Sequence, residues 1–308
     1  MTFSEHRRSR SALRAERVWL PPYQLAAGLL FLLGCSDSDA ARRRLISDLR
    51  SGVVPSGAVV IIGESEESTA GSPIVESLTC VDWIEPKLFN RLLMFRELRR
   101  LILTKRPLSA RDVAEIGRLE ELDTLVLQHC RVEGRISELA SSRKLRELDI
   151  SHSQLEPCSD PSTSPVALET LNAGGSTLED ADIRWLTQSA PGLRKLRIGH
   201  CRVSLESCLR LKDFKNLEYL DCDTAPINAS VVESLGLLRG LKELSLAGTD
   251  VSDDDLRPLM ALTSLAVLRL DRCPNIDGSC LQFLQESPRL RFVTLSETRS
   301  PTTVLDRQ

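Results

Sequence analysis

Three of the four histidines recur at one position of a repeated pattern, where they could together hold a metal ion or an anion. His129 and His152 are 23 residues apart, and His200 follows 48 residues later. Imidazole nitrogens are common metal ligands, and side chains on neighbouring strands lie about 5 Å apart. The alternative is that histidine is simply an acceptable half-exposed residue just before a turn. The sequence favours this alternative, so we expect no bound metal and no cofactor.

Nine cysteines could form disulfides, bind zinc or remain thiols. Cys130, Cys201 and Cys273 stand three repeats apart, which is about 14 Å at a spacing of about 4.8 Å per strand and beyond disulfide reach. There is no Cys-x-x-Cys pair and no Cys/His spacing typical of zinc sites. The sequence therefore predicts buried, unpaired thiols, which are typical of a reducing compartment.

The first 35 residues suggest export and lipid attachment. Five arginines precede an uncharged apolar run over 25–34, and the segment Leu32-Leu33-Gly34-Cys35 resembles a bacterial lipobox. This interpretation predicts a signal peptide over 1–35, a lipid on Cys35 and a membrane-attached lipoprotein. Two alternatives stay open: an uncleaved membrane anchor, or a helix packed on the N-terminal end of the fold in a cytoplasmic protein.

The chain lacks the motifs of the common enzyme classes. It has no nucleophile elbow, phosphate-binding loop, dinucleotide fingerprint or metalloprotease helix, so we predict that it is not an enzyme. The formal net charge is −3, and removal of residues 1–35, with five arginines and two glutamates, would leave −6. A chain of this charge is poorly suited to a phosphate backbone, which argues against a nucleic-acid partner.

The pattern Leu-x-x-Leu-x-Leu occurs nine times in the chain, at intervals of 23 to 25 residues. This pattern predicts the strands and helices on which the residues discussed above lie. The units begin at Leu98, Leu122, Leu145, Leu168, Leu193, Leu217, Leu241, Leu265 and Leu290. A fixed period of this length predicts a solenoid of stacked units. The fourth and sixth positions are mostly apolar and point to one face of a strand, so neighbouring units should share a continuous core.

The seventh unit, LKELSLAGTDVSDDDLRPL over Leu241 to Leu259, resembles the short cysteine-containing and bacterial-type leucine-rich repeats. The resemblance covers about residues 75–300. It implies an α/β solenoid of right hand, with a curved parallel sheet on the concave side and short helices on the convex side. It also implies that the small side chain at the ninth position turns inward and bonds the backbone. Arg106 and Ala225 interrupt that column, so we expect less regular turns there.

Four regions follow from the repeats: an N-terminal segment over 1–35, a linker and cap region over 36–74, the solenoid over 75–300 and a tail over 301–308. Within the cap region we expect an edge strand over 58–62 and a flexible loop over 63–73. The last strand is expected over 290–295. Three prolines between Leu155 and Leu168 exclude a regular helix in the third unit.

The second position of the units alternates in charge. We place it on the concave face, where each charge would lie between two of opposite sign. The column comprises Arg99, Asp123, Arg146, Glu169, Arg194, Glu218 and Lys242. Structural compensation is favoured over partner recognition, because exposed pairs contribute only about 0–1 kcal/mol each.

The concave face is the predicted binding surface for another protein. The candidate contact residues are His129, Asp149, His152, Asn172, Arg197, His200, Tyr219 and Asp221. They predict a non-enzymatic protein–protein interaction scaffold. One alternative is a substrate-receptor adaptor, because the segment 20–49 begins with Leu20-Pro21 and resembles an F-box docking helix. A less favoured alternative is a metal- or anion-binding site at the histidine column.

Overall fold

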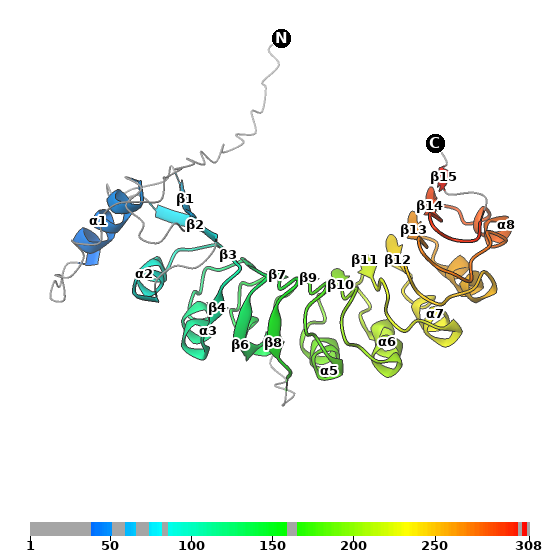
Figure 1. Ribbon diagram of the computed structural model, residues 1–308, viewed down its shortest axis with the longest axis horizontal. Coiled ribbons are helices and arrows are strands. Elements are labelled where there is room, and N and C mark those ends of the chain that lie inside the picture. The colour runs from blue at the N-terminus through cyan, green and yellow to red at the C-terminus, as the bar shows by residue number, and fades with distance from the viewer. Residues whose placement is uncertain are drawn as a thin grey trace, which may run out of the picture.

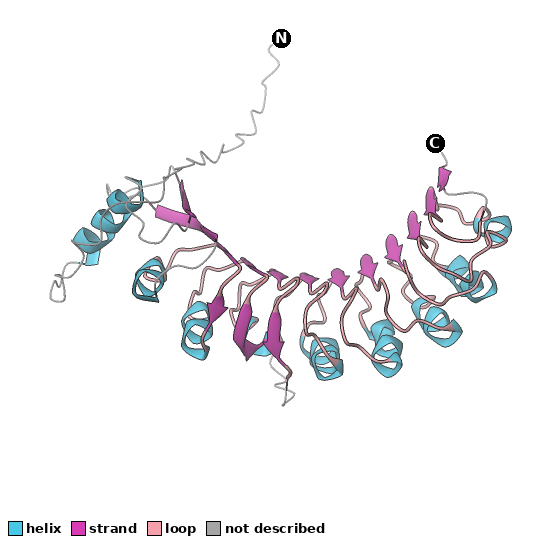
Figure 2. Cartoon of the chain, viewed as in Figure 1, coloured by secondary structure: helices cyan, strands magenta, loops and turns pink. Residues whose placement is uncertain are grey.

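The computed structural model describes residues 38–50, 59–65, 74–81, 86–158, 165–300 and 304–306. These residues form an arch with the strands on its inner side and the helices on its outer side (Figure 1; Figure 2). The proposed signal segment 1–35 and its Cys35 lie outside the described residues. No helix of the described part is both long and apolar enough to cross a membrane.

The inner side of the arch is one 12-stranded sheet. Its strands are, in spatial order, β1 (Val59–Ser65), β2 (Ile74–Val81), β3 (Arg100–Thr104), β5 (Thr124–Gln128), β7 (Glu147–Asp149), β9 (Thr170–Asn172), β10 (Lys195–Arg197), β11 (Tyr219–Asp221), β12 (Glu243–Ser245), β13 (Val267–Arg269), β14 (Phe292–Thr294) and β15 (Val304–Asp306). Strands β2 to β14 pair in parallel, and the two end strands pair antiparallel. This arrangement confirms the predicted α/β solenoid with a curved parallel sheet.

The repeat pattern sets the register of the sheet. The fourth residue of one unit pairs with the fourth residue of the next, as Leu196 does with Leu171 and Leu220. Every side chain of the fourth and sixth columns is buried, and the core runs as one cluster from Leu45 to Leu295. The predicted inward columns are therefore confirmed. One strand and one short helix cannot enclose a core, so each unit is stabilised by its neighbours.

Short helices cover the outer side. They are α2 (Pro86–Leu92), α3 (Ala110–Gly117), α4 (Ile136–Leu139), α5 (Asp180–Ser189), α6 (Leu205–Arg210), η1 (Leu211–Asp213), α7 (Ala229–Leu235), η2 (Asp254–Ala261) and α8 (Leu281–Leu284). Helix α3 shows why they form: Ser109 Oγ accepts the Asp112 amide at 3.3 Å, Asp112 Oδ2 accepts the Ser109 amide at 2.9 Å, and Val113 and Ile116 are buried.

A second, smaller sheet lies among the helices of the outer side (Figure 2). It consists of β4 (Pro107–Leu108), β6 (Arg131–Arg135) and β8 (Gln154–Glu156). Strand β8 occupies the third unit, whose described residues contain no helix, as the prolines predict. Residues 159–164 of that crossover lie outside the described part.

Both ends of the solenoid differ from the prediction. Strand β1 extends through Ser65 and pairs with β2, so the expectation of a loop is wrong for residues 63–65, and residues 66–73 lie outside the described part. Strand β15 lies within the expected tail and pairs antiparallel with β14. These strands pair with the backbone groups at the two edges of the parallel sheet and become its short edge strands. Helix α1 (Ser38–Arg50) adds Leu45, Ile46 and Leu49 to the core cluster.

The ninth column bonds the backbone, as the resemblance implies. Ser153 Oγ donates to Leu127 O at 2.6 Å, and Cys201 Sγ to Ala173 O at 3.0 Å, in each case in the preceding unit. The expectation of an irregular turn is wrong at Ala225, whereas no corresponding bond of the Arg106 amide to Leu103 O is found among the described residues. The Ala225 amide bonds Cys222 O at 3.0 Å, as the Cys201 amide bonds Ile198 O at 3.2 Å. At Ala225 the backbone bond therefore forms the turn without help from the side chain.

Candidate interaction surface

The centre of the concave face is the fifth column of the repeats, which the parallel register brings side by side. Asp149 pairs with Asn172, Asn172 with Arg197, and Arg197 with Asp221. The sequence prediction that these four residues share one face is therefore confirmed. The column continues into the C-terminal half with Ser245, Arg269 and Thr294.

Asp149 is saturated by bonds within the chain. Its Oδ1 accepts the Ser151 amide at 2.9 Å. Its Oδ2 accepts the side-chain amides of Gln128 and Asn172, both at 3.0 Å. Asn172 uses its own oxygen to accept the Gly174 amide at 3.3 Å. These two residues order the ends of the strands, and they have little hydrogen-bonding capacity left for a partner.

Exposed Arg197 and half-buried Tyr219 form a cation–aromatic pair on neighbouring strands. The guanidinium carbon lies 5.0 Å from the ring centroid, and Nε donates to the Tyr219 hydroxyl at 3.2 Å. The pair holds a planar charge and an aromatic ring on a rigid sheet, with little side-chain freedom left to lose on binding.

Asp221 stands beside a second carboxylate that the sequence analysis overlooked. The Asp223 amide donates to Asp221 Oδ1 at 3.1 Å. Asp223 in turn accepts the Ala247 amide at 3.1 Å and the hydroxyl of Ser245. Burial raises the pKa of Asp221 above its ordinary value, and the charge of Asp223 adds to the rise. The sequence contains a signal for this second carboxylate, because Asp223 and Asp271 both occupy the seventh position of their units.

The histidines belong to a column with a common backbone conformation. All nine residues at the eighth position have a positive φ, between 52° and 69°. Histidine, lysine, threonine, arginine and glutamate here adopt the left-handed conformation that favours glycine, which costs about 1–2 kcal/mol each. The sequence placed this column correctly at the turn, but it gave no sign of the strained backbone.

His129 and His152 stack on each other, with ring centroids 4.8 Å apart and planes 6° from parallel. The His152 ring also fills the space beside Gly175, because a Cβ at that glycine would lie 2.6 Å from His152 Nδ1. His200 lies farther along, where its Nδ1 is 3.1 Å from the Thr224 hydroxyl. Across the described residues, no three His, Cys, Asp or Glu side chains converge on a point that could hold a metal ion.

The strained column gives a prediction. Replacing exposed Arg272 (φ 58°) with glycine should raise the free energy of unfolding by about 0.5–1 kcal/mol, because relief of left-handed strain exceeds the added chain entropy of glycine. Urea denaturation measures it. The same change at Arg269, in the extended strand β13, should instead lower stability. Equal effects at both positions would contradict the assigned strain.

The alternating charges lie beside the concave face rather than on it. Each second-position residue stands immediately before its strand, as Arg194 does before β10, so the column follows the edge where the chain enters the sheet. We call it the charge ladder. Arg146 bonds Glu169 at 2.9 Å, and Glu218 bonds both Arg194 and Lys242. Asp123 bonds Thr124 instead, and the expected Arg146–Asp123 pair is absent among the described residues.

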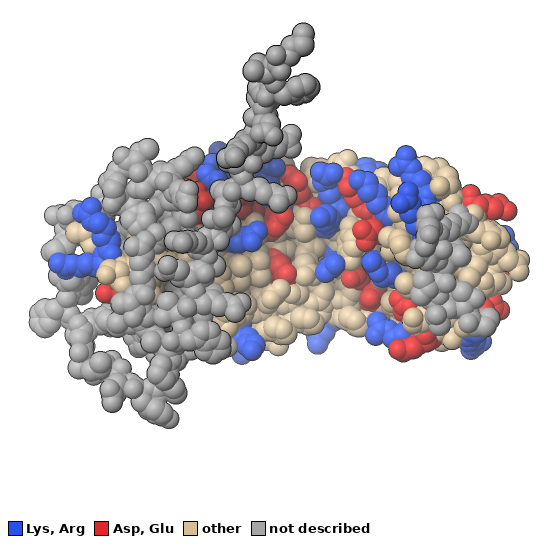
Figure 3. Space-filling model, turned by 90° about the horizontal axis from the view of Figure 1, so that it is seen from above, with Lys and Arg blue, Asp and Glu red and all other residues tan. Residues whose placement is uncertain are grey.

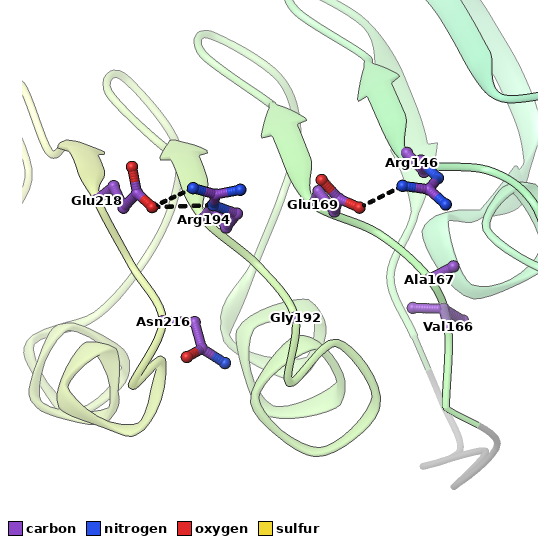
Figure 4. A pocket seen from close by; sticks show the side chains of 8 residues that line it. All are labelled: Arg146, Val166, Ala167, Glu169, Gly192, Arg194, Asn216 and Glu218. Atoms are coloured by element: carbon purple, nitrogen blue, oxygen red, sulfur yellow. Dashed lines mark hydrogen bonds and ion pairs between the residues drawn. The ribbon is translucent and has the colours of Figure 1, made fainter. Parts of the chain in front are cut away.

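A shallow groove of about 580 Å³ lies along this edge. Figure 4 shows the ladder residues Arg146, Glu169, Arg194 and Glu218 above its floor. The floor is formed by Val166, Ala167, Gly192 and Asn216. Hydrogen bonds from Lys242 and Arg194 hold the pKa of Glu218 below its ordinary value. The groove is therefore charged along its rim and neutral at its floor.

The eight described cysteines are free thiols, and only Cys201 among them is not buried. Burial raises the pKa of the Cys80 thiol to about 12 and that of Cys208 to about 11. Thiolate is the reactive form, and an unperturbed thiol has a pKa of about 8.5. These cysteines act as small core residues and not as nucleophiles.

A labelling experiment tests this assignment. With a thiol-reactive disulfide reagent at about pH 8, the unfolded chain should react at every cysteine, whereas in the folded chain Cys201 should be the one described thiol that reacts. The Cys201→Ser variant should lose that reaction. Fast labelling of Cys130 or Cys273, located by peptide mapping, would show that the turn column is open to solvent.

The comparisons with known proteins agree with this architecture, although no protein-family model matches the chain. A probable disease resistance protein of Arabidopsis thaliana is 26% identical over 176 residues, which are 56% of this chain and 14% of that protein. An internalin of Listeria monocytogenes superposes with a TM-score of 0.51 at 22% identity, covering 69% of this chain and 57% of the internalin.

A second solved structure is the leucine-rich-repeat ectodomain of the Arabidopsis receptor kinase HAESA, in complex with a peptide hormone. It superposes with a TM-score of 0.55 at 17% identity, covering 77% of this chain and 40% of the ectodomain. Likenesses at this identity establish the fold, and the chain spans only part of each of these proteins. The nine repeats, the parallel concave sheet and these superpositions show that the chain has the leucine-rich-repeat solenoid fold.

Proposed function

We propose that this chain is a non-enzymatic scaffold that binds another protein on its concave face, centred on Arg197 and Tyr219. The observation that carries the proposal is their cation–aromatic pair, with 5.0 Å between the guanidinium carbon of exposed Arg197 and the ring centroid of half-buried Tyr219, on two neighbouring strands. Arginine and tyrosine are enriched among the residues that dominate binding energy at protein interfaces.

The other candidate residues divide into two groups. Asp149 and Asn172 are used within the chain, so they support the surface rather than contact a partner. The three column histidines are exposed and Asp221 is half-buried, so these residues remain available to a partner. The proposed contact surface therefore centres on β10 and β11 and reaches the histidine column at its edge. The HAESA ectodomain, which shares this fold, was solved with a peptide ligand.

The experiment compares the capture of a partner by three forms of the full chain. The concave variant Arg197→Glu with Tyr219→Ala should weaken binding by about tenfold or more, because it removes the charge and the ring together. Arg184→Glu, an exposed charge reversal on helix α5, is the matched control and should bind as the wild type does. The partner is first identified with wild-type bait and then measured by titration.

Deletion of residues 159–164 tests the rival surface on the convex side. Binding that survives the concave variant but is abolished by this deletion would overturn the proposal. Circular dichroism spectra of all variants should match that of the wild type, since Arg197 and Arg184 are exposed.

A further inference from the structure

The charge ladder of one chain is complementary to the ladder of a second, antiparallel copy. The ion pairs within one chain do not by themselves require this property. Over six consecutive units its charges alternate in sign, in the order Asp123, Arg146, Glu169, Arg194, Glu218 and Lys242. Parallel strands in register place these charges at regular steps along one edge of the arch. If such a row is reversed end to end, every charge meets one of opposite sign.

We propose that two copies of this chain associate edge to edge through the charge ladder, about a two-fold axis that passes between Glu169 and Arg194. In a two-fold interface the same patch is used by both copies, so residue i contacts j and j contacts i. Glu169 then faces Arg194 of the second copy, Arg146 faces its Glu218, and Asp123 faces its Lys242. Each carboxylate gains one cationic neighbour from the second copy, in addition to any within its own chain.

The position of the groove favours an axis between Glu169 and Arg194 over other axes. Its rim is formed by the four ladder residues of units three to six, so its centre lies between Glu169 and Arg194. The residues immediately before the leucine that begins each unit are small there, namely Ala167 and Gly192, which lets two edges approach closely. An axis one step earlier would also match charges, but it would place the long side chain of Lys144, ion-paired with Glu121 at 2.6 Å, next to the axis instead of Gly192.

The shape of the arch permits contact along the whole ladder. Consider a second arch that is rotated by a half turn about an axis along a radius of the first (Figure 1). Its units then run in the opposite order and its flat side is turned over, but it curves in the same direction as the first arch. Two arches can therefore lie edge on edge with their ladders superposed. Their concave faces then point to the same side and stay open, so the pair could engage two partner molecules or one repeated partner.

Basic and acidic side chains gather along the upper margin of the arch in the view from above (Figure 3). Exposed pairs of this kind are individually weak, and salt screens them over about 10 Å at 0.1 M ionic strength. The proposed association is therefore a weak one whose strength depends on several pairs acting together, and it should fall steeply as salt is added.

The test is sedimentation velocity of the full chain over a range of concentrations at about 50 mM and about 500 mM salt. The wild type should dimerise at low salt and dissociate at high salt. In a dimer of the Arg194→Glu variant, the new glutamate of each copy faces Glu169 of the other copy. In a dimer of the Glu169→Arg variant, the new arginine of each copy faces Arg194 of the other copy. Each single variant should raise the dimer Kd by about tenfold.

An equimolar mixture of the two single variants decides the question. In the mixed pair each new glutamate faces a new arginine, and the remaining Glu169 faces the remaining Arg194. Heterodimers should therefore form with a Kd within about threefold of the wild-type value. Arg202→Glu, an exposed reversal in the same unit where the chain leaves the strand, is the matched control and should not alter dimerisation.

The double variant Glu169→Arg with Arg194→Glu separates association from folding. It places like charges next to each other within the chain, at Arg146 and at Glu218, but preserves every opposite-charge contact across the axis. It should dimerise as the wild type does. A wild type that stays monomeric at low salt, or a mixture no tighter than its single variants, would overturn the proposal.

Discussion

Leu196→Ala should lower the free energy of unfolding by about 2–5 kcal/mol, because it leaves a cavity in the middle of the solenoid. Leu196 is fully buried in strand β10 and pairs in register with Leu171 on one side and Leu220 on the other. Each unit is stabilised mainly by its two neighbours, so a defect here weakens both interfaces of the fifth unit.

Urea denaturation followed by circular dichroism measures this loss. Leu237→Ala is the matched control, because the same atoms are removed from a side chain that is 55% exposed after helix α7. The control should change stability by no more than about 0.5 kcal/mol. A loss for Leu196→Ala as small as that of the control would mean that the fourth column does not form the core.

Arg106→Met should have the opposite effect and stabilise the protein by about 1–3 kcal/mol. Arg106 stands in the ninth column where other units have Ser, Thr or Cys, and its side chain is only 4% exposed. Its Nε and Nη1 atoms are buried without an acceptor. Burial lowers the pKa of the guanidinium below its ordinary value, so folding disfavours its charged form.

Methionine keeps the length of the side chain while removing the charge and the unsatisfied donors. The contact of the Arg106 guanidinium with the Phe89 ring, 3.9 Å from its centroid, offsets part of the burial cost and would be replaced by a sulfur–aromatic contact. Arg131→Met, at an exposed position of strand β6, is the control and should be nearly neutral. Destabilisation by Arg106→Met would show that the guanidinium is a net stabilising group.

The sequence by itself determined the solenoid, its register and its core. Leu196 and its counterparts repeat at the fourth position of each unit, and a period of two within a strand sends the fourth and sixth side chains to one face. This information is local and is repeated nine times, so an exception such as Cys222 at a sixth position does not disturb it. The side-by-side placement of Asp149, Asn172, Arg197 and Asp221 follows from the same register.

The tertiary structure decided what those side chains can still do. Asp149 is a candidate contact residue in sequence, but bonds from Gln128 and Asn172 in adjacent strands occupy it. The ring of His152 fills the space that glycine leaves at position 175. The charge ladder lies beside the strands because each strand begins at the third position of its unit, one residue after the ladder residue. Such outcomes depend on contacts between different units, which a pattern within one unit does not contain.

The ends of the solenoid show the same division. Val304–Asp306 has no repeat pattern, yet it forms β15 because the last parallel strand offers an edge of unpaired backbone groups. The left-handed backbone at His129, Thr224 and Arg272 is likewise set by the bonds between successive turns. Sequence periodicity thus determines which faces are buried. The strained turns, the closed edges and the free surface groups are determined only when the units are stacked.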